Sequence, residues 1–142
     1  MTKDCGNREE RNTGKNKTVL KVEDFRLCFN GRFGAVHAVR DANLEVRRGE
    51  IVALVGESGC GKTALCRAIL MLHSAHARYL SGRILLDGRD VRTCSEREME
   101  QIRGKAASLV FQNPLSSLNP VYRIREQLEE PMRRHLGMKE HA

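Results

Sequence analysis

Aromatic residues are scarce in this 142-residue sequence: they make up 4% of the chain, and tryptophan is absent. Proteins that bind single-stranded nucleic acid combine a basic groove with aromatic side chains on which the bases stack. The net charge here is +7, which suits an anionic partner, but no basic run is interleaved with aromatic residues. We therefore expect no nucleic-acid partner.

Two further absences concern cysteine pairs and long apolar runs. The five cysteines are scattered without a C-x-x-C pair, so the sequence predicts neither a zinc site nor a disulfide framework. No apolar run reaches the roughly 18 residues of a membrane-spanning helix, and the N-terminus lacks the apolar stretch of a signal peptide. These features favour a cytoplasmic protein. Residues 1–17 are almost entirely polar, and we expect a disordered leader there and a folded part over residues 18–142.

An apolar run and a glycine-rich segment stand at the centre of the sequence. Residues 51–55 (IVALV) predict a strand buried on both faces, and residues 62–73 carry apolar side chains at helical spacing. Residues 56–63 between them read GESGCGKT, which matches the phosphate-binding pattern G-x-x-x-x-G-K-[ST] at every fixed position. A glycine-rich turn with a solvated lysine is the alternative, and the flanking strand and helix disfavour it.

The residue types in this segment suit a polyphosphate. Main-chain N–H groups at a helix N-terminus bind phosphate, and glycine keeps side chains out of the concave side of the loop. We expect Lys62 to reach the β- and γ-phosphates and the Thr63 hydroxyl to bind Mg²⁺. The residues expected to form the nucleotide site are Gly56, Glu57, Ser58, Gly59, Cys60, Gly61, Lys62 and Thr63.

Alternating and helical patterns predict the remaining elements. Strands are expected over residues 19–29, 35–46, 83–86 and 106–111, and helices over residues 96–103 and 121–135. This order indicates an α/β layered domain preceded by an antiparallel β element.

Turn and cap residues place the element boundaries. Asn30 and Gly31 predict a turn after the first strand. Ser95 and Glu98 form a capping box that starts a helix, and Gly104 is its stop signal. Pro131 is expected to bend or break the last helix.

Two polar features have alternative interpretations. Asp87 ends an apolar run and could bind Mg²⁺, but the glycine that follows it favours a hairpin turn. His73 and His76 are three residues apart and could share a metal. Because no third ligand is nearby, we interpret them as loop or helix-end residues.

Three segments together resemble the first half of the ATPase of ATP-binding-cassette (ABC) transporters: RRGE at 47–50, GESGCGKT at 56–63 and VFQNPLSSLNP at 110–120. The last of these, with YRIREQLEEPMRRHLG at 122–137, is similar to the ATPase subunits of bacterial oligopeptide, dipeptide and nickel importers. The resemblance covers about residues 20–137. It implies a P-loop NTPase-type fold, incomplete at the C-terminus, in an ATP-binding subunit that powers import of peptides or a similar solute.

The resemblance also implies site residues, cofactors and partners. Gln112 matches the Q-loop glutamine that touches the Mg²⁺ site, and Phe29 aligns with the aromatic residue that stacks on adenine. Phe33 competes for that role, and a core position is the alternative for Phe29. The implied cofactors are ATP and Mg²⁺. The implied partners are a second ATPase subunit, transmembrane permease subunits and, indirectly, a solute-binding protein, at the inner face of the cell membrane.

The sequence departs from the family pattern in two respects. Cys60 stands where relatives commonly have serine, and a thiol at a helix N-terminus should have a lowered pKa and be reactive. The thirty residues after Gln112 contain no LSGGQ-like signature, no apolar strand ending in Asp-Glu and no switch histidine. We therefore name no catalytic residue and expect these residues to bind ATP without competent hydrolysis. We also expect residues 51–55 to be left partly unpaired.

Two other functions stay open from the sequence alone. One is a non-catalytic remnant that binds nucleotide or docks on a permease. The other is a soluble P-loop kinase or GTPase, which the lack of an N-K-x-D motif disfavours.

Overall fold

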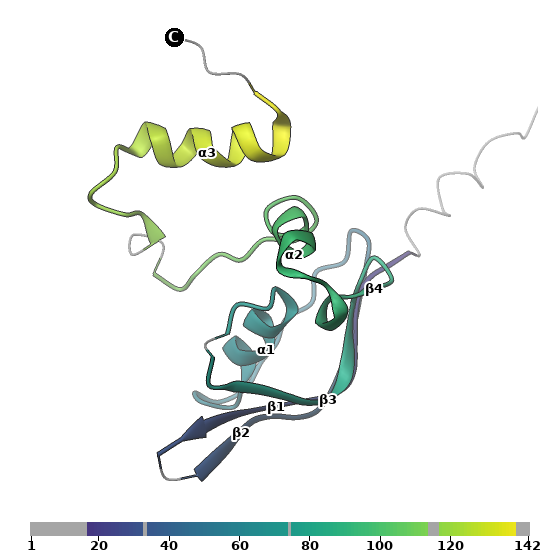
Figure 1. Ribbon diagram of the computed structural model, residues 1–142. Coiled ribbons are helices and arrows are strands. Elements are labelled where there is room, and N and C mark those ends of the chain that lie inside the picture. Colours follow the sequence, from purple (N-terminus) through teal and green to yellow (C-terminus); the bar gives the residue numbers. More distant parts are fainter. Residues whose placement is uncertain (1–16, 33, 74, 114–116, 139–142) are drawn as a thin grey trace, which may run out of the picture. The chain divides into compact units, whose positions relative to one another are not determined.

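The computed structural model describes residues 17–32, 34–73, 75–113 and 117–138 (Figure 1). The chain divides into a first unit, residues 1–93, and a second unit, residues 94–142. The leader predicted over residues 1–17 lies outside the described residues except for Lys17, whose ammonium is 2.9 Å from the carboxylate of Asp87.

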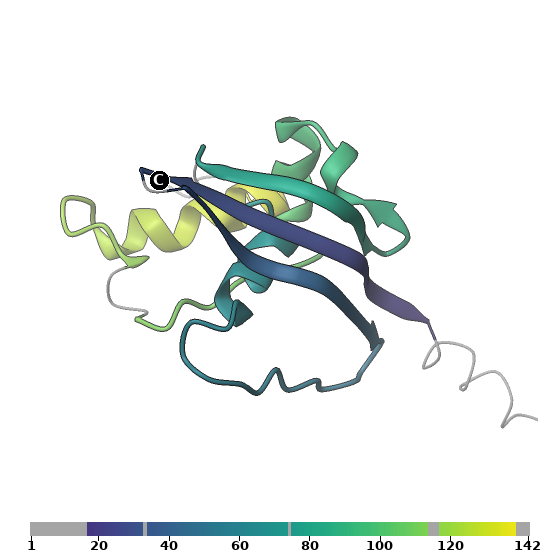
Figure 2. The ribbon, with the colours of Figure 1, turned by 90° about the horizontal axis from the view of Figure 1, so that it is seen from below.

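The first unit is built on a four-stranded antiparallel sheet. Strands β1 (Thr18–Gly31) and β2 (Gly34–Arg47) form a hairpin, and β3 (Ala77–Leu86) pairs with the other side of β1. A short β4 (Arg89–Asp90) gives the order β2-β1-β3-β4. Figure 2 shows β3, β1 and β2 side by side. The N-terminal antiparallel element predicted from the alternating pattern is confirmed.

The hairpins differ from the prediction in their lengths. Asn30 and Gly31 still pair with β2, so the predicted turn at these residues is wrong and the strand runs further. β3 begins at Ala77 rather than at residue 83, because it pairs with β1 as far as Phe29. Asp87 lies in the turn between β3 and β4 with φ 47°, which confirms the hairpin-turn interpretation.

Helix α1 (Lys62–Ile69) covers one face of this sheet (Figures 1 and 2). It ends before the predicted residue 73, because Met71 has a positive φ of 55° that no helix can continue through. The core of the unit joins the sheet, α1 and a single 3₁₀ turn (Val91–Thr93). Its buried apolar residues include Val22, Phe25, Leu27, Val39, Leu65, Ala68, Leu70, Ile84 and Val91. Burial of these side chains is the main favourable term that holds α1 on the sheet.

Two predicted buried strands are wrong. Residues 51–55 and 106–111 form no strand, apart from an isolated bridge between Arg103 and Ala107. Ile51 is 98% exposed and Val55 92% exposed. A strand needs hydrogen-bonding neighbours, and neither segment pairs with a strand within the described part of the chain. Residues 51–55 are therefore unpaired, as expected, but they are exposed rather than buried.

The described residues of the second unit include the helices α2 and α3. α2 (Glu96–Ile102) has the predicted capping box, in which the Ser95 hydroxyl accepts from the Glu98 N–H and the Glu98 carboxylate accepts from the Ser95 N–H. Gly104 lies two residues after the end of α2 and has φ 84°. This left-handed backbone agrees with its predicted role as the stop signal of the helix.

α3 (Ile124–Leu136) contains Pro131 without a break. Of the bend or break expected at this residue, the break is therefore wrong. Glu129 forms ion pairs with Arg125 and Arg133, and the second of these spans the proline. These charges stabilise the turn in which proline removes a backbone donor. The guanidinium of Arg125 and then that of Arg133 lower the pKa of the Glu129 carboxyl.

Candidate phosphate-binding site

The glycine-rich loop leads directly into α1. Gly61 is the N-cap residue, with φ 97° and ψ 0°, and the first backbone bond of the helix runs from the Leu65 N–H to the Gly61 carbonyl at 2.9 Å. The N–H groups in the first turn of a helix have no acceptor inside the helix. Their donors and the positive end of the helix dipole therefore meet at this loop, as the phosphate-binding pattern predicts.

Strand β2 fixes the position of the loop. A Cβ atom at Gly61 would lie 2.1 Å from the carbonyl oxygen of Ala38, which belongs to β2. Two features therefore require glycine at position 61: the left-handed backbone and the close approach to the strand. The contact joins the start of α1 to the edge of the sheet.

The Lys62 side chain folds back over the loop that precedes it. Its ammonium donates to the Gly56 carbonyl at 2.7 Å and to the Glu57 carbonyl at 2.6 Å. A single cation thus stabilises two main-chain carbonyls on the opposite side of the turn. The arrangement places one positive charge beside the N–H groups at the start of α1, which is the charge distribution that a polyphosphate requires.

Cys60 lies next to this ammonium. Its Sγ atom is 3.3 Å from Lys62 Nζ, and the side chain is exposed. The hydrogen bond from Lys62 lowers the pKa of the thiol, so the predicted direction is confirmed. From the sequence we attributed the lowered pKa of Cys60 to the helix N-terminus alone, whereas the hydrogen bond from Lys62 is its largest cause.

The predicted metal ligands fall in different units. Thr63 is the second residue of α1 and is exposed, and Gln112 is exposed in a bend of the second unit. Within the described residues, no group of three or more His, Cys, Asp or Glu side chains could hold a metal ion. The site that can be assembled from one unit therefore comprises residues 56–63 and the elements packed against them.

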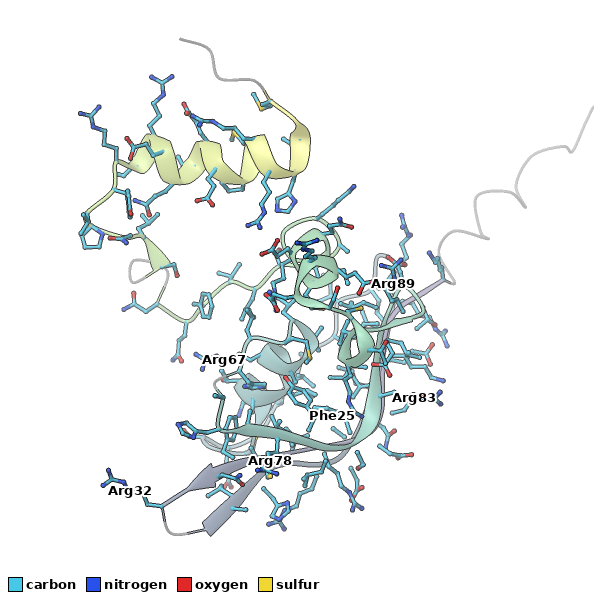
Figure 3. All side chains as sticks on the ribbon, viewed as in Figure 1. Phe25, Arg32, Arg67, Arg78, Arg83 and Arg89 are labelled. Atoms are coloured by element: carbon cyan, nitrogen blue, oxygen red, sulfur yellow. The ribbon has the colours of Figure 1, made fainter. Side chains whose placement is uncertain are left out.

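Phe29, the predicted adenine contact, lies on β1 in the same unit and is half-buried. Its ring meets that of His73 edge to face, with 5.3 Å between centroids. His73 lies 6.0 Å from the ring of Tyr79, which is 5.7 Å from that of Phe25. Phe25 lies between the sheet and α1 (Figure 3). The competing Phe33 lies outside the described residues.

His73 is the residue whose surroundings the sequence did not reveal. We interpreted it as a loop or helix-end residue, which is correct for its place after α1, but its ring contacts come from Phe29 of β1 and Tyr79 of β3. Its Nε2 atom is 2.9 Å from the Ala64 carbonyl of α1. Burial lowers the pKa of the imidazole, with a smaller contribution from the charge of Arg67. Only the long-range antiparallel pairing of β1 with β3 brings these rings together, and hydrophobic periodicity does not encode it.

A glycine-rich loop at the N-terminus of a helix is the phosphate-binding feature of P-loop NTPases. Solved structures show that this chain has the P-loop NTPase fold. The dimeric structure of MJ0796, a bacterial ABC transporter cassette, aligns with a TM-score of 0.69 and 23% identity over 87% of this chain and 49% of that one. A dimeric post-hydrolysis state of the same ATP-binding cassette, bound to ADP and Pi, aligns with a TM-score of 0.65 and 22% identity.

Sequence comparison places the chain within one family. The family model described as ABC transporter matches residues 39–142, and the chain belongs to this family. The oligopeptide transport ATP-binding protein OppD of Bacillus subtilis is 37% identical over 125 residues, which cover 87% of this chain and 35% of OppD. The dipeptide transport ATP-binding protein DppD of the same organism is 38% identical over 87% of this chain and 37% of DppD. The chain thus spans about a third of the length of these relatives.

Proposed function

We propose that this chain is the nucleotide-binding part of an ATP-binding subunit that powers peptide import by an ABC transporter. The observation that carries the proposal is the loop over residues 56–63, where the Lys62 ammonium and the first turn of α1 meet. The transport ATP-binding proteins to which the chain is similar support peptides as the solute class. Membership of the ABC transporter family does not favour a soluble P-loop kinase or GTPase, or a non-catalytic remnant.

The residues of the loop fit ATP and Mg²⁺ by their chemistry. Phosphate oxygens accept from the N–H groups around Gly59 and Gly61 and from Lys62, which would exchange its carbonyl acceptors for phosphate. Mg²⁺ prefers oxygen ligands, and the Thr63 hydroxyl, exposed beside Lys62, is the oxygen that α1 offers. Bound Mg²⁺ would neutralise phosphate charge. Phe29, on β1 of the same unit, is the proposed adenine contact. For Gln112 of the second unit, the role of a Mg²⁺ contact stays a prediction from the resemblance.

The proposal includes partners and a location. A dimeric cassette among the structural neighbours supports a second ATPase subunit as partner. The transport proteins to which the chain is similar support a transmembrane permease as a partner. Beyond the permease, the proposal includes a solute-binding protein. Across the described residues no helix is both long and apolar enough to cross a membrane. As a transporter subunit, the protein would lie at the inner face of the membrane through its contact with a permease.

Nucleotide titration of the Lys62→Ala variant tests the proposal. Removal of the ammonium should weaken ATP·Mg²⁺ binding at least about tenfold, because a charged hydrogen-bond donor to phosphate is lost. Isothermal titration calorimetry of the full chain measures the effect. Lys105→Ala, which removes an exposed lysine of the second unit, is the matched control and should bind like the wild type. Equal ATP affinity of the Lys62→Ala variant and the wild type would refute the assignment.

Thiol labelling gives an independent readout of the same loop. Because Lys62 lowers the pKa of Cys60, iodoacetamide should alkylate this residue readily at neutral pH. Alkylation should block ATP binding, and ATP·Mg²⁺ should slow the labelling. Cys60→Ser keeps a small polar side chain and should bind ATP after the same treatment. Labelling of Cys60 at one rate with and without nucleotide would count against the site.

A further inference from the structure

Half of the phenylalanine and tyrosine residues of this aromatic-poor chain gather in one row of rings. The sequence has four phenylalanines and two tyrosines. Phe25 contacts Tyr79 directly, and the imidazole of His73 links Tyr79 to Phe29. Phe25 is fully buried at one end of the row, and Phe29 is half-buried at the other. The row thus runs from the core of the first unit to its surface.

His73 joins this row to the helix that starts at the phosphate loop. Its Nε2 atom is 2.9 Å from the carbonyl oxygen of Ala64. Because a carbonyl oxygen can only accept, Nε2 must carry the proton of this hydrogen bond. Ala64 directly follows Thr63 in the first turn of α1. The imidazole therefore contacts both the predicted adenine residue and the first turn of the predicted phosphate helix.

We propose that His73 is a positioning residue, which holds the Phe29 ring at a fixed place relative to the phosphate loop so that one nucleotide engages both. The inference rests on the proposed function, since it assumes that Phe29 contacts the base. A nucleotide has a limited span between base and triphosphate. A ring held at the matching separation therefore loses less freedom on binding than one that has to be ordered by the ligand.

The contacts on the two sides of the imidazole explain why a histidine suits this place. A phenyl ring would meet Phe29 but could not donate to Ala64, and a flexible amide would donate without supporting the ring. The imidazole makes both contacts with one rigid plane. Its contribution should therefore concern the base half of the nucleotide, and the triphosphate half should be bound by the loop as before.

Comparing ATP·Mg²⁺ with inorganic tripolyphosphate·Mg²⁺ separates these halves. In the His73→Ala variant, ATP affinity should fall about two- to tenfold, the loss expected from one aromatic contact, while tripolyphosphate affinity stays unchanged. His73→Phe keeps a ring against Phe29 without the hydrogen bond, and it should show a smaller loss. His76→Ala removes an exposed histidine of the same loop and should leave both affinities unchanged. Calorimetry on the full chain, with circular dichroism to verify folding, provides the measurement.

The outcomes distinguish the inference from the proposed function. An equal loss of ATP and tripolyphosphate affinity in the His73→Ala variant would mean that His73 only stabilises α1, and it would overturn the inference. Unchanged affinity for both probes would overturn it too, with the proposed function intact. If the wild-type chain bound neither probe, the proposed function would fail and the inference with it. Should the alanine variant not fold, the His73→Phe variant decides: a lower ratio of ATP to tripolyphosphate affinity supports positioning, and an unchanged ratio overturns it.

Discussion

The sequence predicts strands both in the antiparallel sheet and over the apolar segment at residues 51–55, but the two regions are opposite in structure. Phe25 of β1 is fully buried, whereas Ile51 is 98% exposed and Val55 is 92% exposed. The difference lies in where the hydrogen-bonding partners come from. β1 finds them in β2, joined to it by a tight hairpin, and in β3. A strand of a parallel sheet must instead find partners through crossover connections.

The comparison teaches that apolar character does not determine burial by itself. Residues 51–55 and 106–111 have the composition of interior strands, yet they form no strand within the described part of the chain. The sheet of β1 to β4 and helix α1 instead bury their apolar side chains against each other. Three predictions test this contrast, from the largest expected effect to the smallest.

Substitution of a core residue should separate the two regions most clearly. Phe25→Ala should lower the free energy of unfolding by about 3–5 kcal/mol, because it leaves a cavity beneath α1. Val55→Ala should change it by less than about 0.5 kcal/mol, because this side chain is almost fully exposed. Urea denaturation followed by far-ultraviolet circular dichroism measures both. A large loss for Val55→Ala would show that residues 51–55 pack in solution.

Two glycines of the phosphate loop provide a finer comparison. Gly61→Ala should cost about 1–3 kcal/mol of stability, because the new Cβ meets the Ala38 carbonyl and the backbone is left-handed. Gly59 has φ 83°, but no atom lies within 4 Å of the position that a Cβ would take there, so Gly59→Ala should cost only about 1 kcal/mol. The same denaturation experiment measures the stability loss of each variant. The difference between the two losses reports the contact of Gly61 with β2. Equal losses would mean that the loop moves away from the strand.

The smallest effect concerns pH. Burial lowers the pKa of His73 in the folded chain below its ordinary value of about 6.5, so the unfolded state takes up the proton first as the pH falls. This contribution to stability is complete above about pH 6.5 and declines as the pH falls towards the lower, folded pKa. Urea midpoints at pH 7.5 and pH 5.5 should therefore differ less in the His73→Gln variant than in the wild type.

A pH dependence of the His73→Gln variant equal to that of the wild type would contradict this prediction, because the burial of His73 would then not be the cause.

The sequence predicted the elements that local signals define. Alternation gave β1 and β2, the Ser95 and Glu98 pattern gave the start of α2, and the glycines around Lys62 gave the start of α1. Local signals did not settle the ends of α1 and β3, since these depend on the backbone at Met71 and on pairing with Phe29.

The surroundings of the candidate site were less accessible to the same reasoning. The pattern over residues 56–63 identified the loop, and the lowered pKa of Cys60 agrees with the prediction. The support from the Ala38 carbonyl and the contact between Phe29 and His73 were missed. Both join residues that are more than twenty positions apart, and they arise only once α1 lies on the sheet.

The contacts of Lys62 have a consequence for how quickly a ligand leaves the loop. An anion that bound at the proposed site would have to displace the Gly56 and Glu57 carbonyls from the ammonium, so the net gain would be the difference between two sets of hydrogen bonds. On dissociation of the anion, the same carbonyls would take its place, and the cation would not be left without acceptors. Such an exchange would lower the barrier to dissociation of the anion.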